Sequence, residues 1–444
     1  MAQPTKLSIC AAVVLLTTLA CGQSQSPTIT PAPSSTATES PTPEPTQPAA
    51  SIETPLPQPA PAETQPPTQT PTQPAGQAGV FWRVTALPAA LPSAYAEVQV
   101  DAPADGAVWV ITSQEALRWF NQTWEAVLSE SEDMLASADD EGRLWVLRPD
   151  ASEIQAWQDR QWAAYGAESG WTDALTADEM SWWSPTSWRA LNDLTGLLWL
   201  PTSRDVRLFD GESWSLFTLE DMSFPPAEME DIGVIHRLVL GGGADLWVGE
   251  CYYGGPGPMG GQGVRWFDRT TWLGAEVPLG PTCVSAVAAE KSGNVWLGAE
   301  DTVWRYRYSD QTWTEYRLPQ EFLGDYNFAN ARQLIVDGNG DAWVILELCG
   351  GASCSGPAQV YRIHAGEWSL IKETPYWDLP LKHLAVDGSG QGWLFWDGEV
   401  YKLEGESMET VASIMARSVD VSPDGRVWVV AEEENGAALW LLEP

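Results

Sequence analysis

"SGNVWLGAEDTVWRYRYSDQTWTEYRLP", residues 292–319, holds three short segments in which apolar and polar residues alternate, and each segment contains a tryptophan. Alternation over this length predicts β-strands with one buried face, and the Gly, Asp and Ser residues between the segments predict tight turns. The stretch therefore indicates a small antiparallel unit, and copies of this unit recur along the chain.

Eight strand-like segments are centred on a tryptophan in the same local context. These residues are Trp109, Trp145, Trp199, Trp247, Trp296, Trp343, Trp393 and Trp428. Successive members are separated by 36, 54, 48, 49, 47, 50 and 35 residues. A repeat of this length built from short strands is typical of a β-propeller. We predict an all-β propeller of eight four-stranded blades, or seven if the divergent unit near Trp145 is not a blade.

The repeated residues have structural explanations, with the strands of each blade lettered a to d from the inside outward. A glycine stands three residues before the tryptophan in every copy except that of Trp247, which has Ala244 there. The turn between strands a and b needs a positive φ, which glycine adopts without steric cost. We expect the strand-b tryptophans to pack between blades, each contributing about 2–3 kcal/mol through burial. The same role is expected for the strand-d residues Trp124, Trp162, Trp214, Trp272, Trp313 and Trp368.

The last copy contains only three strands before the sequence ends, "ARSVDVS" (416–422), "RVWVVAE" (426–432) and "AALWLLE" (437–443). The segment "GVFWRVTALP" (79–88) has the pattern of a fourth strand and precedes the first strand a. Pairing of this N-terminal strand with the last blade would cover both exposed edges. We therefore predict one propeller domain over residues 79–444.

A family resemblance follows from the repeat itself. The run D/E-x-x-G-x-V/L-W-V/L-G, then a short turn and V-x-R-Y/W/F, resembles the two-component regulator propeller repeat, with the best matches at 290–319 and 104–128. The resemblance implies a propeller of the kind found in periplasmic sensor regions of membrane histidine kinases. No kinase core or receiver pattern follows the last repeat, so we expect a propeller without a kinase domain.

The first 78 residues have the composition of an export signal and a stalk. A twelve-residue apolar run (9–20) fits a signal-peptide core and is too short to span a bilayer. It ends in "TLACG", which resembles the bacterial lipoprotein signal and implies lipidation of Cys21 after a signal peptide of residues 1–21. Thr18 departs from that pattern, and ordinary secretory cleavage is the alternative. Residues 22–78 are rich in Pro, Thr and Ser and cannot form a core, which predicts a disordered stalk. We expect an extracytoplasmic lipoprotein anchored to a membrane.

Composition narrows the range of partners. Sixty acidic residues against 23 Lys and Arg give a formal net charge of −37, which disfavours nucleic acid and anionic membrane surfaces. Three histidines and no Cys-x-x-Cys argue against a metal site, and no cofactor is expected. "DGNGD" (337–341) resembles a calcium loop only at its start, because Ala342 and Leu348 replace required residues. We expect a monomer that contacts a membrane only through its lipid.

Long loops offer the most room for a binding surface. In a propeller the d–a and b–c loops share one face, and five of them are long, at 168–188, 250–263, 319–331, 348–359 and 373–382. Their aromatic residues Trp183, Tyr253, Tyr326 and Trp377 can stack on sugar rings, or else cover the core. Four cysteines lie in or beside the same loops, and in an oxidising compartment we expect the disulfides Cys251–Cys283 and Cys349–Cys354.

Basic residues are scarce, yet six stand ten or eleven positions before a repeat tryptophan, at the start of an innermost strand. They are Arg189, Arg237, Arg332, Lys382, His383 and Arg417, with Gln99 and Gln333 at the same level. One interpretation is ion pairing with acids of the d–a loops. The other is a site at the channel mouth for an acidic or polyhydroxylated ligand, of which Arg189, Arg237, Arg332, His383 and Arg417 would be the binding residues.

Three functional classes remain. We favour a non-catalytic binding or scaffold propeller that recognises a glycan or an extracytoplasmic protein at the d–a/b–c loop face. A propeller-type polysaccharide lyase or hydrolase needs a carboxylate pair or a Tyr or His base beside an Arg, and the sequence singles out no catalytic residue. A sensory partner of a separate two-component kinase is the third. The recurring turn acids Asp193, Asp337 and Asp387 are expected to be structural acceptors.

Overall fold

The computed structural model describes 81–88, 98–130, 133–172, 175–176, 180, 188–193, 195–202, 205–224, 233–241, 245–253, 260–274, 282–350, 356–374, 382–434 and 436–443. At 233–237, 240, 251–253 and 260–262 only the backbone is described. All these residues belong to one compact unit, Gln73–Pro444. The expected signal peptide, Cys21 and stalk lie outside the described residues. In the described part of the chain, no helix is long and apolar enough to cross a membrane.

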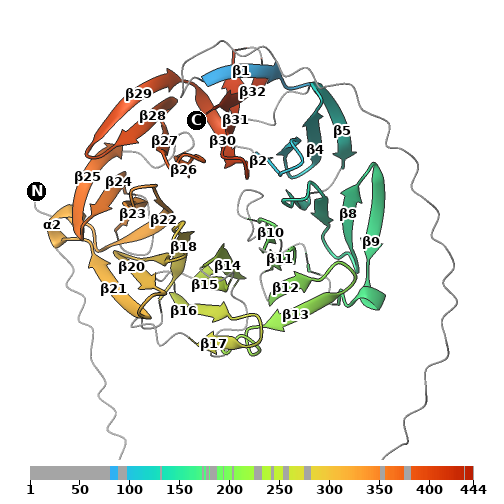
Figure 1. Cartoon of the computed structure of the whole chain (residues 1–444), viewed down its shortest axis with the longest axis horizontal. Helices are drawn as coiled ribbons and strands as arrows, with labels where there is room; N and C mark the ends of the chain where they lie inside the picture. Colours follow the sequence, from blue (N-terminus) through green and yellow to red (C-terminus); the bar gives the residue numbers. More distant parts are fainter. Residues whose placement is uncertain are drawn as a thin grey trace, which may run out of the picture. The chain divides into compact units, whose positions relative to one another are not determined.

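Eight four-stranded antiparallel sheets are arranged around a centre as the blades of a β-propeller (Figure 1). Blades 1 to 3 are β2 (Gln99–Asp101), β3 (Val108–Ile111), β4 (Glu115–Phe120), β5 (Thr123–Ser129); β6 (Leu135–Ala138), β7 (Leu144–Leu147), β8 (Ile154–Gln158), β9 (Gln161–Tyr165); and β10 (Leu191–Asn192), β11 (Leu198–Pro201), β12 (Asp205–Phe209), β13 (Trp214–Thr218). Blades 4 and 5 are β14 (Gly233–Leu240), β15 (Leu246–Tyr253), β16 (Gly260–Phe267), β17 (Trp272–Gly274); and β18 (Val284–Ala289), β19 (Val295–Ala299), β20 (Thr302–Arg307), β21 (Thr312–Arg317).

Blades 6 to 8 complete the ring. They are β22 (Phe328–Val336), β23 (Ala342–Cys349), β24 (Ala358–His364), β25 (Glu367–Thr374); β26 (His383–Val386), β27 (Gly392–Trp396), β28 (Glu399–Glu404), β29 (Ser407–Ser413); and β30 (Met415–Val421), β31 (Val427–Glu433), β32 (Gly436–Leu442) with β1 (Phe81–Ala86). In the described d–a connections lie the short helices η1 (Ala167–Ser169) and α2 (Gln320–Leu323). The predicted eight-bladed propeller is confirmed, and the unit around Trp145 is a complete blade.

The N-terminal strand closes the last blade, as the sequence predicted. β1 pairs antiparallel with β32, from Phe81 opposite Leu442 to Ala86 opposite Ala438. The Phe81 ring also lies 6.3 Å from that of Trp393 in blade 7, so the strand contributes to an interface as well as to a sheet. Blade 8 therefore combines strands from both ends of the domain, and β1 takes the place of its fourth strand.

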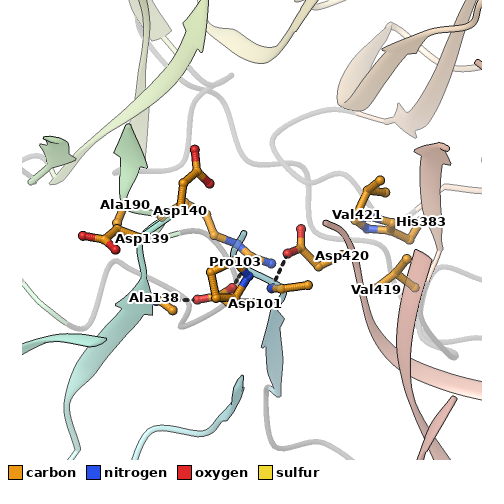
Figure 2. Close-up of a pocket in the computed structure, with 12 residues that line it drawn as sticks. Asp101, Pro103, Ala138, Asp139, Asp140, Ala190, His383, Val419, Asp420 and Val421 are labelled. Atoms are coloured by element: carbon orange, nitrogen blue, oxygen red, sulfur yellow. Dashed lines mark hydrogen bonds and ion pairs between the residues drawn. The ribbon is translucent and has the colours of Figure 1, made fainter. Parts of the chain in front are cut away.

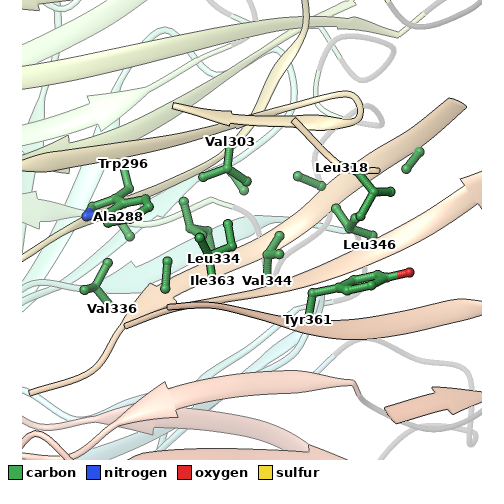
Figure 3. Packing of buried hydrophobic residues seen from close by; sticks show 14 of the residues in the cluster. Ala288, Trp296, Val303, Leu318, Leu334, Val336, Val344, Leu346, Tyr361 and Ile363 are labelled. Carbon is green, nitrogen blue, oxygen red and sulfur yellow. The ribbon is translucent and has the colours of Figure 1, made fainter. Parts of the chain in front are cut away.

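The core lies between the blades. All eight strand-b tryptophans are buried. Trp145 of blade 2 shows how they pack, because its ring contacts Phe209 and Trp214 of blade 3 at 5.2 and 5.4 Å. Figure 3 shows the corresponding layer between blades 5 and 6, where Trp296 and Val303 face Leu334 and other apolar residues of the next blade. The predicted packing role of these tryptophans is confirmed.

The strand-d tryptophans are less uniform than predicted. Trp214 is buried, and Trp124, Trp272, Trp313 and Trp368 are half-buried against neighbouring clusters. Trp162 departs from them, with 41% of its surface exposed. At this interface Trp157 of strand c packs edge-on against Trp109 of blade 1 at 5.3 Å instead. The prediction that Trp162 is part of the inter-blade core is therefore wrong.

The a–b turns explain why the repeat keeps its glycine and its acid. Gly142 has φ +84°, and all the corresponding glycines have a positive φ. In blade 7, Asp387 accepts hydrogen bonds from the backbone N–H of Ser389 and Gln391 and from the indole N–H of Trp393. Asp139, Asp193 and Asp337 make the same arrangement in blades 2, 3 and 6. In blade 5, Glu290 accepts from the Trp296 indole and from the side chains of Ser292 and Asn294 instead of the backbone. One carboxylate thus fixes the turn and satisfies a buried indole, as predicted for Asp193, Asp337 and Asp387.

Candidate functional site: an axial cavity

A cavity of about 350 Å³ lies where the innermost strands of five blades face one another (Figure 2). Its lining comes from β2, β26 and β30, from the end of β6 and the turn after it, and from the segment before β10. The lining residues are Asp101, Ala102, Pro103, Ala138, Asp139, Asp140, Arg189, Ala190, His383, Val419, Asp420 and Val421. We call this space the axial cavity. Two of the predicted binding residues, Arg189 and His383, belong to it.

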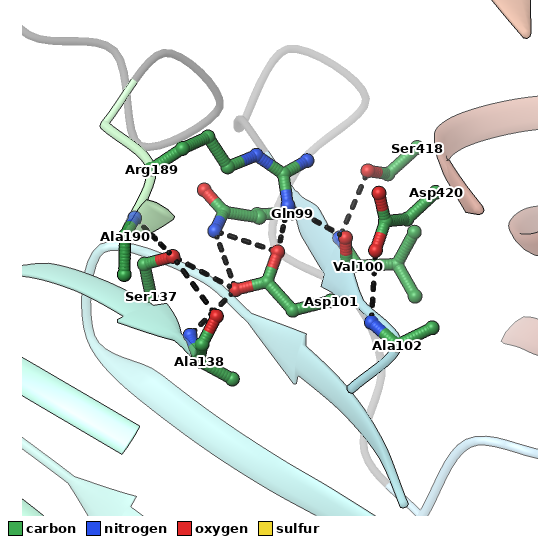
Figure 4. Close-up of polar contacts among 10 residues, drawn as sticks. All are labelled: Gln99, Val100, Asp101, Ala102, Ser137, Ala138, Arg189, Ala190, Ser418 and Asp420. Carbon is green, nitrogen blue, oxygen red and sulfur yellow. Dashed lines mark hydrogen bonds and ion pairs between the residues drawn. The ribbon is translucent and has the colours of Figure 1, made fainter. Parts of the chain in front are cut away.

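The walls of the axial cavity are held by side chains that bond the backbone of the next blade (Figure 4). Asp101 of blade 1 accepts from the Ala138 N–H of blade 2 at 2.7 Å. Asp420 of blade 8 accepts from the Ala102 N–H of blade 1 at 2.9 Å. Further contacts of this kind join Ser418 to Val100, Ser137 to Ala190 and Gln333 to Leu384. Polar side chains can face the axis because they satisfy one another and the exposed edges of strand a.

Asp101 is the most fully bonded residue of the wall. Besides the Ala138 N–H, its carboxylate accepts from Gln99 Nε2 at 2.8 and 2.7 Å and from Ser137 Oγ at 3.2 Å. It also forms an ion pair with Arg189, which reaches it from blade 3. Asp101 is 3% exposed, so these donors replace water around a buried charge. The side chain is therefore a structural acceptor.

Arg189 uses one of its guanidinium nitrogens, Nη1, in hydrogen bonds with described residues. Its Nη1 donates to Asp101 and, at 3.0 Å, to the carbonyl oxygen of Val100. Its other guanidinium nitrogens make no hydrogen bond among the described residues, and the side chain is 35% exposed. An arginine fixed in this way presents oriented donors to a molecule in the cavity, but its charge is already matched by Asp101.

Two carboxylates in the cavity have no cationic partner in direct contact within the described part of the chain. Asp140 is exposed at the cavity wall and makes no side-chain hydrogen bond there. Partial burial, together with the negative charges of Asp139, Asp420 and Glu141, raises the pKa of Asp140 to about 6. Burial also raises the pKa of Asp420, although nearby Arg189 opposes this. Both groups are under-compensated, which is a property of binding and catalytic sites.

His383 adds a neutral polar group. Burial and the charge of Arg189 lower the pKa of His383 to about 4, so its imidazole is uncharged at neutral pH. In the described structure its hydrogen-bonding neighbour is Gln333 Nε2, at 3.3 and 3.4 Å from the two ring nitrogens. The cavity lining therefore carries four carboxylates and one charged cation, and is acidic rather than basic.

Arg332, Lys382 and Arg417 are not among the residues that line the axial cavity. Arg332 pairs with the buried Glu347 of β23, and Arg417 pairs with Glu432 of β31 at 3.0 Å. These partners lie on strand b of the same blade. Much of the d–a loops lies outside the described residues, so pairing with d–a loop acids stays a prediction. Lys382 is half-buried, with Nζ 5.6 Å from the centre of the Trp396 ring. The Arg237 side chain lies outside the described residues.

The expected aromatic platform can be followed only at Tyr326. Its ring is half-buried and packs against the hydrophobic cluster between blades 5 and 6, which agrees with a covering role. Trp183, Trp377 and the side chain of Tyr253 lie outside the described residues. The aromatic sugar platform on this face stays a prediction.

The cysteine and metal expectations are tested in part. Cys283 and Cys349 are both disulfide-bonded. The side chains of their expected partners, Cys251 and Cys354, lie outside the described residues, so the pairing stays a prediction. Among the described residues, no group of three or more His, Cys, Asp or Glu side chains is arranged to hold a metal ion. Asp341 of the "DGNGD" turn instead pairs with Arg362 and with His364 Nδ1 at 2.6 Å.

Sequence reasoning missed the acids of the cavity. Asp101 and Asp420 both stand eight residues before a repeat tryptophan, two positions after the level at which the basic residues were noticed. Because strand side chains alternate, positions ten and eight residues before the tryptophan share one face. Counting back to both positions would have placed these carboxylates beside Arg189. Asp140 follows the turn acid Asp139 and gives no such periodic signal.

Comparisons with known proteins do not assign the site. No family model matches the chain. No curated protein matches it either. Similar solved structures include a virginiamycin B lyase from Staphylococcus aureus, with 12% identity, 70% of this chain and 94% of that one covered, and a TM-score of 0.40. They also include the extracellular domain of a putative hybrid two-component system from B. thetaiotaomicron (12% identity, 80% and 51% covered, TM-score 0.39).

A third similar structure is PorZ, a surface component of the type-IX secretion system of Porphyromonas gingivalis. It has 14% identity and a TM-score of 0.35, and the match covers 75% of this chain and 55% of PorZ. The chain spans about half the length of this protein and of the two-component system domain. Similarities at these TM-scores do not carry an argument about function.

Proposed function

We propose that the protein is a non-catalytic binding propeller that acts outside the cytoplasm and takes a polar ligand in its axial cavity. The observation that carries the proposal is the convergence of open polar groups from separate blades: Arg189, Asp140 and Asp420 face one space of about 350 Å³. A purely structural channel would need only groups that satisfy one another, as Asp101 does. Donors and acceptors left open in a preformed cavity are the usual means of orienting a ligand.

The charges favour a neutral or amino-bearing glycan over an acidic one. Arg189 is paired with Asp101, while Asp140 and Asp420 have no cationic partner in direct contact among the described residues. A uronate would meet two carboxylates and one arginine that is already paired. Hydroxyl groups can donate to carboxylates and accept from a guanidinium, and an ammonium group would offset the excess negative charge. The acidic glycan suggested by the basic residues of the sequence therefore loses its main support.

The binding role fits the chemistry of His383. A general base works best when its pKa is close to the operating pH, and this imidazole has a pKa of about 4. Gln333 is its described hydrogen-bonding neighbour, and among the described residues no carboxylate orients it as in a hydrolytic triad. The neutral imidazole of His383 is better suited to exchange one hydrogen bond with a bound ligand than to act as a general base.

The cellular setting of the proposal rests on the sequence. A signal-like N-terminus ending in the lipoprotein-type "TLACG" supports anchoring through Cys21, with residues 22–78 as a spacer between membrane and propeller. The disulfide-bonded state of Cys283 and Cys349 fits an oxidising compartment. We include the pairings Cys251–Cys283 and Cys349–Cys354 in the proposal.

One observation favours a second candidate, a glycoside hydrolase. Asp140 and Asp420 are two carboxyl groups in one cavity, both with a raised pKa. A carboxyl group with a pKa near 6 can serve as a general acid while a second carboxylate assists. Turnover of an oligosaccharide that is lost in both Asp140→Asn and Asp420→Asn would identify this activity.

The test is calorimetric titration of neutral, amino-bearing and uronate oligosaccharides against the full chain and an Asp140→Asn, Asp420→Asn double variant. The matched control is Glu406→Gln, Glu409→Gln, which removes two exposed carboxylates of blade 7. We expect neutral or amino-bearing glycans to bind the wild type and the control alike, and the double variant about tenfold or more weakly. Equal binding to all three proteins, or binding of uronates alone, would contradict the proposal.

A further inference from the structure

A second cavity lies on the opposite face from the d–a and b–c loops, between blades 1 and 2. It has a volume of about 730 Å³. It is bounded by the β4–β5 hairpin, the β8–β9 hairpin and the turn after β2, and we call it the blade 1/2 groove. Its lining residues are Asp105, Arg118, Phe120, Asn121, Thr123, Trp124, Glu125, Trp157, Asp159 and Arg160. The groove shares no lining residue with the axial cavity.

The floor of the groove is a fixed stack of a guanidinium and aromatic rings. Arg118 pairs with Asp105 at 2.8 Å, and its guanidinium carbon lies 4.4 Å from the centre of the Phe120 ring and 5.4 Å from that of Trp157. Trp124 is fixed separately, because its indole N–H donates to the carbonyl oxygen of Ala86 in blade 8 at 2.9 Å. A lining held this firmly loses little side-chain entropy when a ligand binds.

Trp162 adds an exposed aromatic surface beside the groove. It stands directly opposite Trp157 in the β8–β9 pairing, and directly opposed residues of an antiparallel pair project from the same face of a sheet. This face of blade 2 points towards blade 1, because Trp157 on it packs against Trp109. With 41% of its surface exposed, Trp162 is more open than any other described tryptophan of the repeats. It offers stacking area that the core does not use.

The two hairpins that bound the groove have strained turns. Asn121 and Gln122 have φ +49° and +62°, and Asp159 and Arg160 have φ +50° and +61°. Each turn therefore places two consecutive residues in the left-handed region without a glycine, where a glycine would remove the steric cost. Non-glycine residues in such conformations cluster at active sites and ligand-binding sites. Of these residues, Asn121, Asp159 and Arg160 line the groove.

The charges of the groove nearly balance. Arg118 is paired with Asp105, and Arg160 approaches Glu125 across the blade boundary at 3.5 Å. Only the Asp159 carboxylate makes no side-chain contact within the described structure. The Arg160 side chain is 80% exposed, so its guanidinium is available to other acceptors. Such a lining attracts neither strong anions nor strong cations, but it offers donors and acceptors side by side.

We infer that the blade 1/2 groove binds a neutral saccharide, with a sugar ring stacked on Trp162 and hydroxyl groups bonded to Asp159 and Arg160. A sugar ring has an apolar C–H face that stacks on an aromatic ring, and vicinal hydroxyls that suit carboxylate and guanidinium groups. The inference does not depend on a ligand in the axial cavity, because the two sites share no residue.

The test uses the full chain carrying Asp140→Asn and Asp420→Asn, so that binding in the axial cavity is already weakened. The protein is labelled with 5-fluorotryptophan, and the Trp162 resonance is identified by its loss in Trp162→Phe. Hexaoses of β-1,4-linked glucose and of N-acetylglucosamine are titrated, together with a neutral tetrapeptide as the alternative ligand. We expect one of the hexaoses to shift the Trp162 resonance in a saturable manner.

Substitutions then locate the site. Measured by calorimetric titration, Trp162→Ala and Arg160→Ala should each weaken saccharide binding about tenfold, since stacking and a bidentate hydrogen bond are of that order. Met415→Ala removes an exposed apolar side chain of blade 8, which is 43% exposed, and should change nothing. The inference is overturned if neither hexaose shifts the resonance at millimolar concentration, if only the peptide does, or if Trp162→Ala binds as tightly as its parent.

Discussion

The strand-b tryptophans and the cavity-facing residues of strand a occupy equally regular positions, yet the structure uses them in opposite ways. Every strand-b position holds a tryptophan, and all eight are buried between blades. The positions ten residues before these tryptophans differ from blade to blade, with Gln99, Arg189 and His383 among them. Some of these side chains bond the next blade, and others, such as Arg189, keep free donors.

The difference teaches where to look for function in a repeat protein. A residue that is identical in all blades meets a requirement common to all blades, which is packing. A residue that appears in one blade only, such as Asp140 beside Asp139, has no counterpart in that common requirement. Trp162 shows the converse case. It has the residue type that recurs in strand d, but Trp157 takes its place against Trp109, and the Trp162 ring is exposed.

The largest expected effect concerns the strand that completes blade 8. Deleting residues 79–88 removes β1, exposes the edge of β32 and uncovers the Trp393 contact of Phe81. We expect a loss of about 5 kcal/mol or more, a large part of the stability of a typical domain. Deleting residues 22–78 should leave the unfolding free energy almost unchanged. Similar melting temperatures for the two deletions would disprove closure by β1.

The next effect compares two tryptophans of the same blade. Trp145→Ala removes a buried ring that contacts blade 3 and donates its indole N–H to Asp139 at 2.8 Å, so a loss of about 3–5 kcal/mol is expected. Trp162→Ala should cost about 0.5 kcal/mol or less, because the ring is exposed. Chemical denaturation of both variants measures the difference. Equal losses would show that Trp162 belongs to the core after all.

A smaller effect separates the bonded and the open acids of the axial cavity. Asp101→Asn places an amide group against donors from Gln99, Ala138 and Arg189, and should cost about 2–3 kcal/mol. Asp420→Asn keeps one acceptor oxygen for the Ala102 N–H and should cost about 1 kcal/mol or less. The reverse order of the two losses would mean that the hydrogen-bond roles are misassigned.

The smallest effect has the opposite sign. The pKa of Asp140 is about 6 in the folded state, against 3.8 for the same group in the unfolded chain. At a pH between these two values, Asp140 is protonated in the folded state and ionised in the unfolded state. Stability from this group therefore falls as the pH rises towards 6. Asp140→Asn should stabilise the protein at neutral pH by about 1 kcal/mol or less, since solvent screens an exposed group, and have no effect below about pH 4. Thermal unfolding at both pH values measures this.

Much of the architecture could be predicted from the sequence, because it follows from local rules repeated eight times. The alternation around Trp296 and the glycine three residues before it report backbone requirements that recur from blade to blade, and the acid at the turn recurs in five of the eight copies. The missing fourth strand of the last copy also pointed directly to 79–88. Trp162 was mispredicted because its exposure depends on which residue of blade 2, Trp157 or itself, meets Trp109.

The axial site was only partly predictable. Counting along the repeat located Arg189 and His383, but charge alone could not show which acid each cation meets. Arg332 and Arg417 meet glutamates of strand b, four residues after the repeat tryptophan, and that pairing depends on cross-strand register. The raised pKa of Asp140 depends first on partial burial and then on three other acids brought together by two blades, and no single segment contains that information.

The most direct test of a ligand site in the axial cavity is a carbon NMR titration of the Asp140 carboxyl group, identified by its absence in Asp140→Asn. In the free protein we predict a midpoint near pH 6, because partial burial and the neighbouring acids raise the pKa of Asp140. Saturation with a neutral or amino-bearing oligosaccharide should displace that midpoint, because hydroxyl or ammonium donors stabilise the carboxylate. A midpoint near the ordinary value of 3.8, unchanged by every oligosaccharide, would contradict the account.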